Sequence, residues 1–161
     1  MLWNLAGDGA SQVYNAWNTA VKLTWSCPRG TRTYLVQQVL SAEMDSARTD
    51  ILVRYGKFLT SLKNSPSKEV AMMANLVSRD VRTTTGANLK LIQEASGLPI
   101  WGTSQEKLRE ALRVEEAVMV PKCDKWRVPY LSKLLEHRQE LYYRGEDVKE
   151  NDDLINSLCI N

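Results

Sequence analysis

The run from Arg79 to Leu89 concentrates the side chains of this sequence that are best suited to hold an anion. Between its ends lie a second arginine, Arg82, an aspartate, three threonines and a glycine, at the expected start of a helix. A guanidinium offers phosphate a planar pair of donors, and the amides at a helix start point outward. Arg79 and Arg82 are therefore candidate phosphate contacts. A structural role fits equally well, with Arg79 paired to Asp80 and a threonine serving only as a helix cap.

Other basic side chains are spread over the N-terminal part of the chain. Residues 1–100 carry 11 basic and 7 acidic side chains, whereas residues 101–161 carry 10 and 12. A polyanionic partner would therefore meet the N-terminal two-thirds more readily than the acidic tail. The basic residues that flank segments rich in Trp, Tyr and Thr are Lys22, Arg29, Arg32, Arg48, Arg54, Lys57, Arg79, Arg82 and Lys90.

The side chains that catalysis or metal binding would need are sparse. His137 is the one histidine, and a solvated or half-buried imidazole on a helix is its better interpretation. The three cysteines, Cys27, Cys123 and Cys159, lack the paired spacing of a zinc site. Paired carboxylates such as Glu115–Glu116 are expected on exposed faces, and the scattered glycines form no phosphate loop. We expect no enzymatic activity, metal site, cofactor or small-molecule substrate.

Cysteine usage and hydropathy indicate the compartment. An odd number of distant cysteines argues against a disulfide scaffold and fits a reducing environment. No segment resembles a signal peptide, and no apolar run approaches the ~18 residues of a membrane span. We expect an intracellular protein, in the cytoplasm or nucleus, that does not contact a membrane.

Helical periodicity dominates the elements that must position these residues. Apolar side chains recur every three or four positions over 11–25, 31–40, 51–62, 70–81, 89–95, 108–118 and 131–142, with a short tail helix near 154–158. The pattern predicts an all-α fold, an irregular multi-helix domain of about six to eight helices. Residues 34–40 are the one run for which a strand stays open.

Cap residues predict where several of these helices begin. Ser65 is the expected N-cap of the segment that carries the 70–81 stripe, with Pro66 at the first helical position. Thr84 or Thr85 is expected to cap the next helix, and Thr103 to open a capping box for the one after it.

Four blocks of residues also follow one order along the chain. They are Trp17-Asn18 with Lys22-Leu23 and Trp25; Pro28-Arg29 with Thr31 and Tyr34-Leu35-Val36; Arg54-Tyr55 with Phe58, Ser61-Leu62, Ser65-Pro66-Ser67 and Glu69-Val70; and Ala74-Asn75-Leu76-Val77 with Arg79-Asp80-Val81-Arg82, Thr84-Thr85-Gly86 and Asn88-Leu89. Together they resemble the region that follows the polymerase domain in LINE-type (non-LTR) retrotransposon reverse transcriptases. Met1–Leu5 resembles the lead-in to that region, and past Trp101 the likeness thins.

The resemblance implies a helical region that flanks the nucleic-acid path and helps hold template RNA or primer DNA. Carried over residue by residue, it marks Arg29, Arg32, Arg79 and Arg82 as contacts to the nucleic-acid backbone. Lys22 is a further candidate for the same role. Arg32 is a departure, because family members usually place histidine there, although arginine could still stack or pair with phosphate. The paired polymerase aspartates, an endonuclease signature and a zinc knuckle are absent from the sequence, so the resemblance is to a non-catalytic piece.

The resemblance divides the chain into a helical domain at 1–101 and a helical extension with an acidic C-terminal tail at 102–161. Aromatic side chains near Trp25 and Tyr34 could stack on unpaired bases. Two alternatives stay open. A helical protein-interaction module, docking for example onto the polymerase body, predicts an uncovered apolar groove. A retroelement remnant without function predicts weakly cooperative unfolding.

Overall fold

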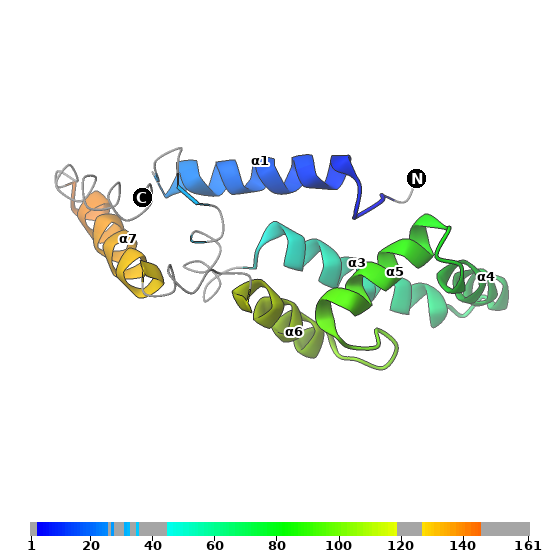
Figure 1. Cartoon of the computed structure of the whole chain (residues 1–161). Coiled ribbons are helices and arrows are strands. Elements are labelled where there is room, and N and C mark those ends of the chain that lie inside the picture. The colour runs from blue at the N-terminus through cyan, green and yellow to red at the C-terminus, as the bar shows by residue number, and fades with distance from the viewer. Residues whose placement is uncertain are drawn as a thin grey trace. The chain divides into compact units, whose positions relative to one another are not determined.

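The computed structural model of the chain describes residues 3–25, 27, 31–32, 35, 45–118 and 127–145. This part of the chain forms six α-helices and no strand, which confirms the all-α class and the predicted number of helices. The helices are α1 (Asp8–Thr24), α3 (Ala47–Lys63), α4 (Lys68–Arg79), α5 (Thr84–Ser96), α6 (Gln105–Val118) and α7 (Arg127–Arg144) (Figure 1). The expected helices at 31–40 and 154–158, and the strand alternative at 34–40, fall mostly or wholly outside the described residues.

The chain forms two compact units. Unit 1 comprises Met1–Tyr14 and Ala47–Glu116, and unit 2 comprises Asn15–Ser46 and Ala117–Asn161. The division expected at 101/102 marks the end of the sequence resemblance. The compact units of the structure do not divide the chain at that point. Most of α6 belongs to unit 1, because Leu108 and Leu112 are buried in the same core as side chains of α3 and α5.

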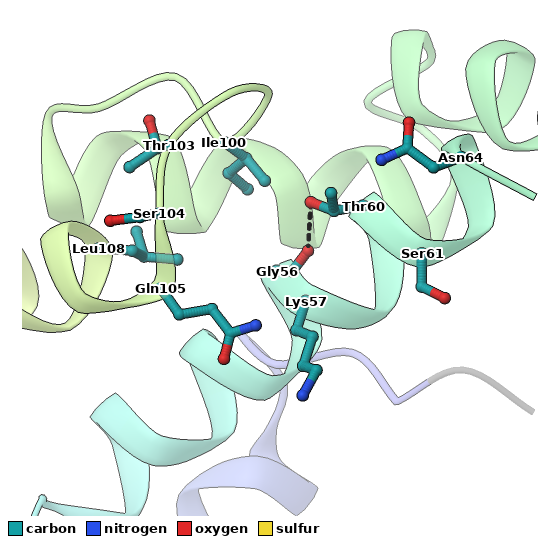
Figure 2. Close-up of a pocket in the computed structure, with 10 residues that line it drawn as sticks. All are labelled: Gly56, Lys57, Thr60, Ser61, Asn64, Ile100, Thr103, Ser104, Gln105 and Leu108. Carbon is teal, nitrogen blue, oxygen red and sulfur yellow. Dashed lines mark hydrogen bonds between the residues drawn. The ribbon is translucent and has the colours of Figure 1, made fainter.

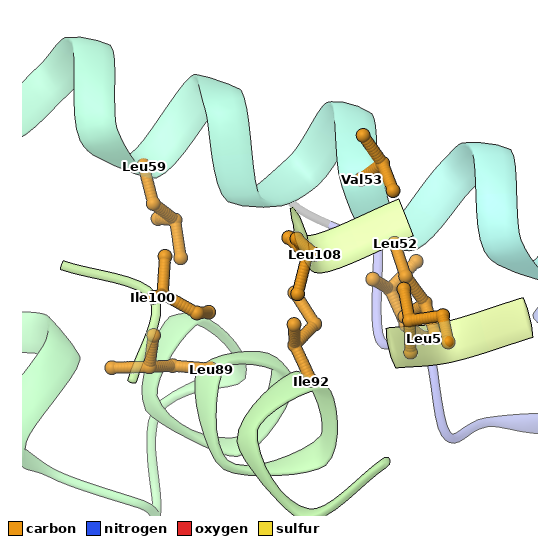
Figure 3. Packing of buried hydrophobic residues seen from close by; sticks show 9 residues of the cluster. Leu5, Leu52, Val53, Leu59, Leu89, Ile92, Ile100 and Leu108 are labelled. Atoms are coloured by element: carbon orange, nitrogen blue, oxygen red, sulfur yellow. The ribbon is translucent and has the colours of Figure 1, made fainter. Parts of the chain in front are cut away.

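Aliphatic side chains of α3, α5 and α6 build the core of unit 1 (Figure 3). The buried members of this cluster are Leu5, Leu52, Val53, Leu59, Leu89, Ile92, Ile100, Leu108 and Leu112. Leu52, Ile92 and Leu112 have no exposed surface. Burial of such side chains removes apolar surface from water and is the main stabilising term for a unit of this size.

The buried face of α3 is rotated from the stripe that periodicity predicts, which consists of Ile51, Tyr55, Phe58, Leu59 and Leu62. Leu52, Val53 and Gly56 are buried there, whereas Phe58 is 43% exposed. The reason is the close approach of α6 at the glycine. A Cβ built on Gly56 would stand 3.1 Å from Cδ2 of Leu108, so the helices meet where α3 has no side chain. Apolar spacing along α3 could not indicate this contact, because it depends on the partner helix.

A buried amide fastens the N-terminal segment to α5. Asn88 is fully buried; its Oδ1 accepts a hydrogen bond from the Leu5 amide (2.9 Å), and its Nδ2 donates to the Trp3 carbonyl (2.6 Å). One side chain therefore satisfies a main-chain donor and a main-chain acceptor from a segment more than eighty residues away. The two bonds hold Leu5 where it enters the core of unit 1.

An ion pair joins the start of α3 to the end of α6. The two guanidinium nitrogens NH1 and NH2 of Arg48 lie 2.6 and 3.5 Å from the carboxylate of Glu115, and Glu116 lies 3.8 Å away. The side chains of these glutamates are only 24% and 15% exposed. The expectation that Glu115–Glu116 lies on an exposed face is therefore wrong, because packing α6 against α3 places both carboxylates beside Arg48.

Two helices of unit 1 begin later than their cap signals predict. Ser67 is the N-cap of α4 and accepts from the Val70 amide (3.3 Å), so the prediction of Ser65 as cap is wrong. The hydroxyl of Ser65 is used within the turn, where it accepts from the Ser67 amide. At α6 the capping hydroxyl is that of Ser104, which accepts from the amide three residues on.

The Thr103 hydroxyl donates back to the carbonyl of Pro99, and the amide at the start of α6 donates to Ser104 instead. The predicted capping box headed by Thr103 is therefore wrong. Serine and threonine hydroxyls in adjacent positions compete for local carbonyls and amides, and spacing alone does not decide between them.

The described core of unit 2 is smaller. Leu131 and Leu135 of α7 pack with Leu35 and Cys27, and Trp25 covers part of this cluster.

Arg29, one of the predicted nucleic-acid contacts, lies outside the described residues.

We predict that Asn88→Ala lowers the free energy of unfolding by about 2–4 kcal/mol, because it leaves the buried Leu5 amide and the partly buried Trp3 carbonyl without their partners. Lys90→Ala is the matched control on the same helix, since the Lys90 side chain is 60% exposed and its loss costs at most about 0.5 kcal/mol. Urea unfolding followed by circular dichroism measures both. Equal midpoints for the two variants would contradict the role of Asn88.

Candidate nucleic-acid interface

The two candidate arginines of unit 1 lie at the corner between α4 and α5. Arg79 is the last residue of α4 and Asp80 its C-cap, and a short turn leads to α5. Arg79 is exposed, and the side chain of Arg82 is 88% exposed. The structure therefore brings this predicted pair to one surface corner, three residues apart.

Thr83 organises the inner side of this corner. Its hydroxyl faces the carbonyl oxygens of Val77 (2.6 Å) and Asp80 (2.7 Å), and its oxygen accepts from the Gly86 amide (3.0 Å). The single O–H is thus shared between two carbonyls at the end of α4, and the hydroxyl oxygen satisfies an amide at the start of α5. The prediction that Thr84 or Thr85 caps α5 is wrong by one or two residues, because only Thr83 reaches both helix ends.

Gly86 permits the turn to lie directly against the first turn of α5. A Cβ at this position would stand 2.1 Å from the carbonyl oxygen of Asp80 and 2.6 Å from its carbonyl carbon. Real side chains do not approach main-chain atoms so closely, and both contacting atoms belong to a turn fixed by Thr83. The Gly86 amide is also occupied by that cap, so it is not available to an anion.

Asp80 pairs with Arg82. The Arg82 Nε and NH2 atoms each lie 3.0 Å from one carboxylate oxygen of Asp80, and the Arg82 amide donates to Oδ1 at 3.0 Å. The guanidinium and the amide hold the pKa of the Asp80 carboxyl below its ordinary value, and the carboxylate raises the pKa of Arg82. The local salt bridge expected between Arg79 and Asp80 is therefore wrong, because Asp80 pairs with Arg82 instead.

Arg79 keeps its donors open. Among the residues whose positions are described, no ion pair or side-chain hydrogen bond involves its guanidinium. Four of the basic residues noted in the sequence are engaged with carboxylates: Arg82 with Asp80, Arg48 with Glu115, Arg54 with Asp50, and Lys90 with Glu94. Arg79 is thus the arginine of this corner with its full charge available to a partner.

The other predicted contacts belong to unit 2. Lys22 is half-buried near the end of α1, and Arg32 is exposed next to the buried Thr31. Trp25, proposed as a stacking residue, is half-buried against the Leu131 cluster. The structure therefore groups Arg79 with Arg82 in one unit and Lys22 with Arg32 in the other.

A hollow of about 330 Å³ with a mixed polar and apolar lining lies between α3 and the start of α6 (Figure 2). Lys57 is the one ionisable side chain among the ten that line it; the others include hydroxyls, amides and apolar groups. The Thr60 hydroxyl, which faces this hollow, donates to the Gly56 carbonyl of its own helix (3.0 Å). The lining thus holds one cation and several neutral polar groups, with no carboxylate or imidazole partner to move a proton.

A second hollow, of about 360 Å³, is almost entirely apolar and lies between α3 and α4. Leu59 and Leu62 of α3 line one side, and Val70, Met73 and Val77 of α4 line the other. The predicted α4 stripe at 70–81 is buried only at Ala74, whereas Val70, Met73 and Val81 are 40%, 58% and 56% exposed. Periodicity correctly indicated a helix there, but its apolar face lies open.

Metal-binding and membrane-spanning features are not found in the described part of the chain. No three His, Cys, Asp or Glu side chains there lie close enough to hold an ion. His137 is exposed on α7, and Cys27 is buried, while Cys123 and Cys159 fall outside the described residues. None of the helices described is both long enough and apolar enough to cross a bilayer.

No family model, curated protein or solved structure matches this chain. The likeness to retrotransposon reverse transcriptases therefore stays a prediction from sequence motifs.

We predict that Gly86→Ala destabilises unit 1 by about 3 kcal/mol or more, because the added methyl forces the Asp80 main chain away from α5. Gly9→Ala is the matched control, since nothing lies within 4 Å of a Cβ at Gly9, and alanine in a helix gains up to about 1 kcal/mol over glycine. Thermal and urea unfolding measure both variants. A Gly86→Ala protein as stable as Gly9→Ala would refute the close approach.

We further predict that Arg82→Ala raises the pKa of Asp80 toward its ordinary value near 3.8. The folded chain lowers this pKa, so the contribution of the Asp80 carboxylate to stability is present above pH 3.8 and lost as the pH falls through the lowered value. Carboxyl NMR titration of both proteins measures the change. An unaltered Asp80 titration would show that the guanidinium pairing is absent in solution.

Proposed function

We propose that this chain is a non-catalytic piece of a retrotransposon reverse transcriptase that contacts template RNA or primer DNA. Arg79 and Arg82 hold phosphates in this proposal. The observation that supports it best is the α4–α5 corner, where both guanidiniums are exposed on a turn whose inner side is fixed by Thr83 and Gly86. Phosphate contacts from a preorganised turn position a nucleic acid without reading its sequence.

The two arginines contribute unequally. Arg82 already uses Nε and NH2 on Asp80, so its remaining donors and only part of its charge face a phosphate. Arg79 has no such carboxylate partner among the described residues and meets a phosphate with its whole fork. Loss of Arg79 should therefore weaken binding more than loss of Arg82.

The resemblance extends the proposal beyond this corner. It assigns backbone contacts to Lys22, Arg29 and Arg32 as well, with stacking near Trp25 and Tyr34. These assignments rest on the sequence blocks, and an intracellular location in cytoplasm or nucleus belongs to the same proposal. A polymerase body that shares the nucleic-acid path would be the natural partner.

A protein-interaction module is the second candidate function, and a specific observation favours it. The open apolar side of α4, with Met72, Met73 and Leu76 each more than half exposed, is the uncovered surface that this alternative predicts. Clustered apolar side chains of this kind mark contact sites on soluble proteins. Methionine suits such a surface because its flexible thioether adapts to a partner.

We predict that the protein binds single-stranded and structured RNA at low salt and that replacing Arg79 and Arg82 by Ala weakens this binding. Each phosphate contact releases counterions, so the double variant should reduce the slope of log affinity against log salt by about 1.4 for a single strand. Filter binding over a salt series measures the slope, and the single variants test whether Arg79 contributes more.

The matched control is the double variant Arg54→Ala/Lys107→Ala, which removes two exposed positive charges from other helices of unit 1. It should leave the slope nearly unchanged if the corner is the site. Equal losses in both double variants would indicate diffuse attraction to a basic protein. No RNA binding at 50 mM salt would end the proposal.

A further inference from the structure

The outward face of α4 carries an ordered stripe rather than a scatter of apolar side chains. Glu69, Met72, Leu76 and Arg79 recur at intervals of three, four and three residues, which places them in line along one face of the helix. Met72 and Leu76 are 60% and 58% exposed, and both charged residues are exposed. α4 packs mainly on α3 and α5, and the exposure of Met72 and Leu76 shows that this stripe is not part of those contacts.

The stripe is complementary to itself when reversed. We propose that α4 is the surface through which two copies of this chain associate, as an antiparallel pair of helices related by a two-fold axis at the level of Ala74. Residues 72 and 76, like residues 69 and 79, are equally far from position 74. Antiparallel pairing therefore sets Met72 against Leu76 of the second copy and Glu69 against Arg79 of the second copy, twice each.

The charges select both the partner and the direction. Parallel pairing would face Glu69 with Glu69 and Arg79 with Arg79, and like charges in contact oppose association. In the antiparallel pair each end of the apolar centre closes with an attraction. A two-fold axis makes such a surface isologous, because every contact occurs twice.

Both charged groups are available for this contact. The Glu69 carboxylate accepts from the Ser67 hydroxyl (2.6 Å), which lowers its pKa and keeps it ionised, and no cation pairs with it in the described part of the chain. Arg79 likewise lacks a carboxylate partner among the described residues. The apolar groove lined by Val70 and Met73 adjoins the stripe and extends the apolar surface toward α3.

The size of the contact indicates a reversible dimer. α4 has 12 residues, and a helix of that size is about 18 Å long, so the pair buries an area at the small end of specific interfaces. We therefore expect dissociation in the micromolar to millimolar range. This inference does not depend on the proposed nucleic-acid contact; because Arg79 belongs to both surfaces, a second copy and RNA would compete for it.

Sedimentation velocity over a concentration series tests the dimer, and charge reversal tests its geometry. Glu69→Arg and Arg79→Glu should each raise the dimer dissociation constant about tenfold or more, because each turns two attractions into repulsions. The double variant Glu69→Arg/Arg79→Glu should restore it to within about threefold. Mixing the two single variants should yield a heterodimer, since all charges then pair across it.

Met72→Ser/Leu76→Ser should abolish dimerisation, whereas Val114→Ser, at a 54% exposed apolar position on α6, should not. Circular dichroism and the unfolding temperature check that each variant is folded. A protein that stays monomeric up to about 1 mM overturns the inference. So does a dimer that ignores the reversals, or single variants that fail to form a heterodimer when mixed.

The two proposals fail separately. Glu69→Arg should disrupt the dimer without weakening RNA binding, and Arg82→Ala should weaken RNA binding without changing the dimer. A monomeric protein that still binds RNA through the α4–α5 corner overturns the dimer alone. A chain that dimerises but does not bind RNA even at concentrations where it is monomeric overturns the nucleic-acid function alone.

Discussion

The contact between the Asp80 main chain and the Cα of Gly86 is the constraint on which the α4–α5 corner depends. It lets the end of one helix and the start of the next share a single capping hydroxyl, that of Thr83. A helix end normally leaves several main-chain groups without partners. Here two ends satisfy part of that need together, and hydrogen bonds define the short turn.

Several residues in the run 79–89 therefore serve the fold. Thr83 caps, Gly86 provides clearance, and Asn88 ties the N-terminal segment to α5. The Thr83 hydrogen bonds occupy the inner side of the turn, and the two arginines lie exposed on its outer side. One of them, Arg82, is oriented by Asp80, and the other, Arg79, is held only by its place at the end of α4.

α4 contributes no side chain to the main buried cluster of unit 1. It rests on α3 and α5, and it buries only one residue, Ala74, while larger apolar side chains face outward. A unit that gained nothing from those side chains would be more soluble with polar residues in their place. The opposed charges of Glu69 and Arg79 at the two ends of the apolar stripe add order to that surface, which random exposure would not produce.

Much of the fold could be predicted from the sequence, and less of the site. Local periodicity was sufficient for the helical class and for the helices of unit 1, since the 3.6-residue repeat is a property of each segment alone. The exposed position of Arg79 and Arg82 also followed from a polar turn between helices. The cap of α5 did not, because Thr83, Thr84 and Thr85 are chemically alike and only the position of the α4 carbonyls distinguishes them.

The sequence by itself thus determined which segments are helical and which residues carry charge. The tertiary structure decided which face of each helix is buried. On α3 the close approach at Gly56 turned the core face away from Phe58, and on α4, which packs mainly on α3 and α5, Met72 and Leu76 stay exposed. The physical reason is the same in both cases: burial is a relation between two elements, and a local pattern records only one of them.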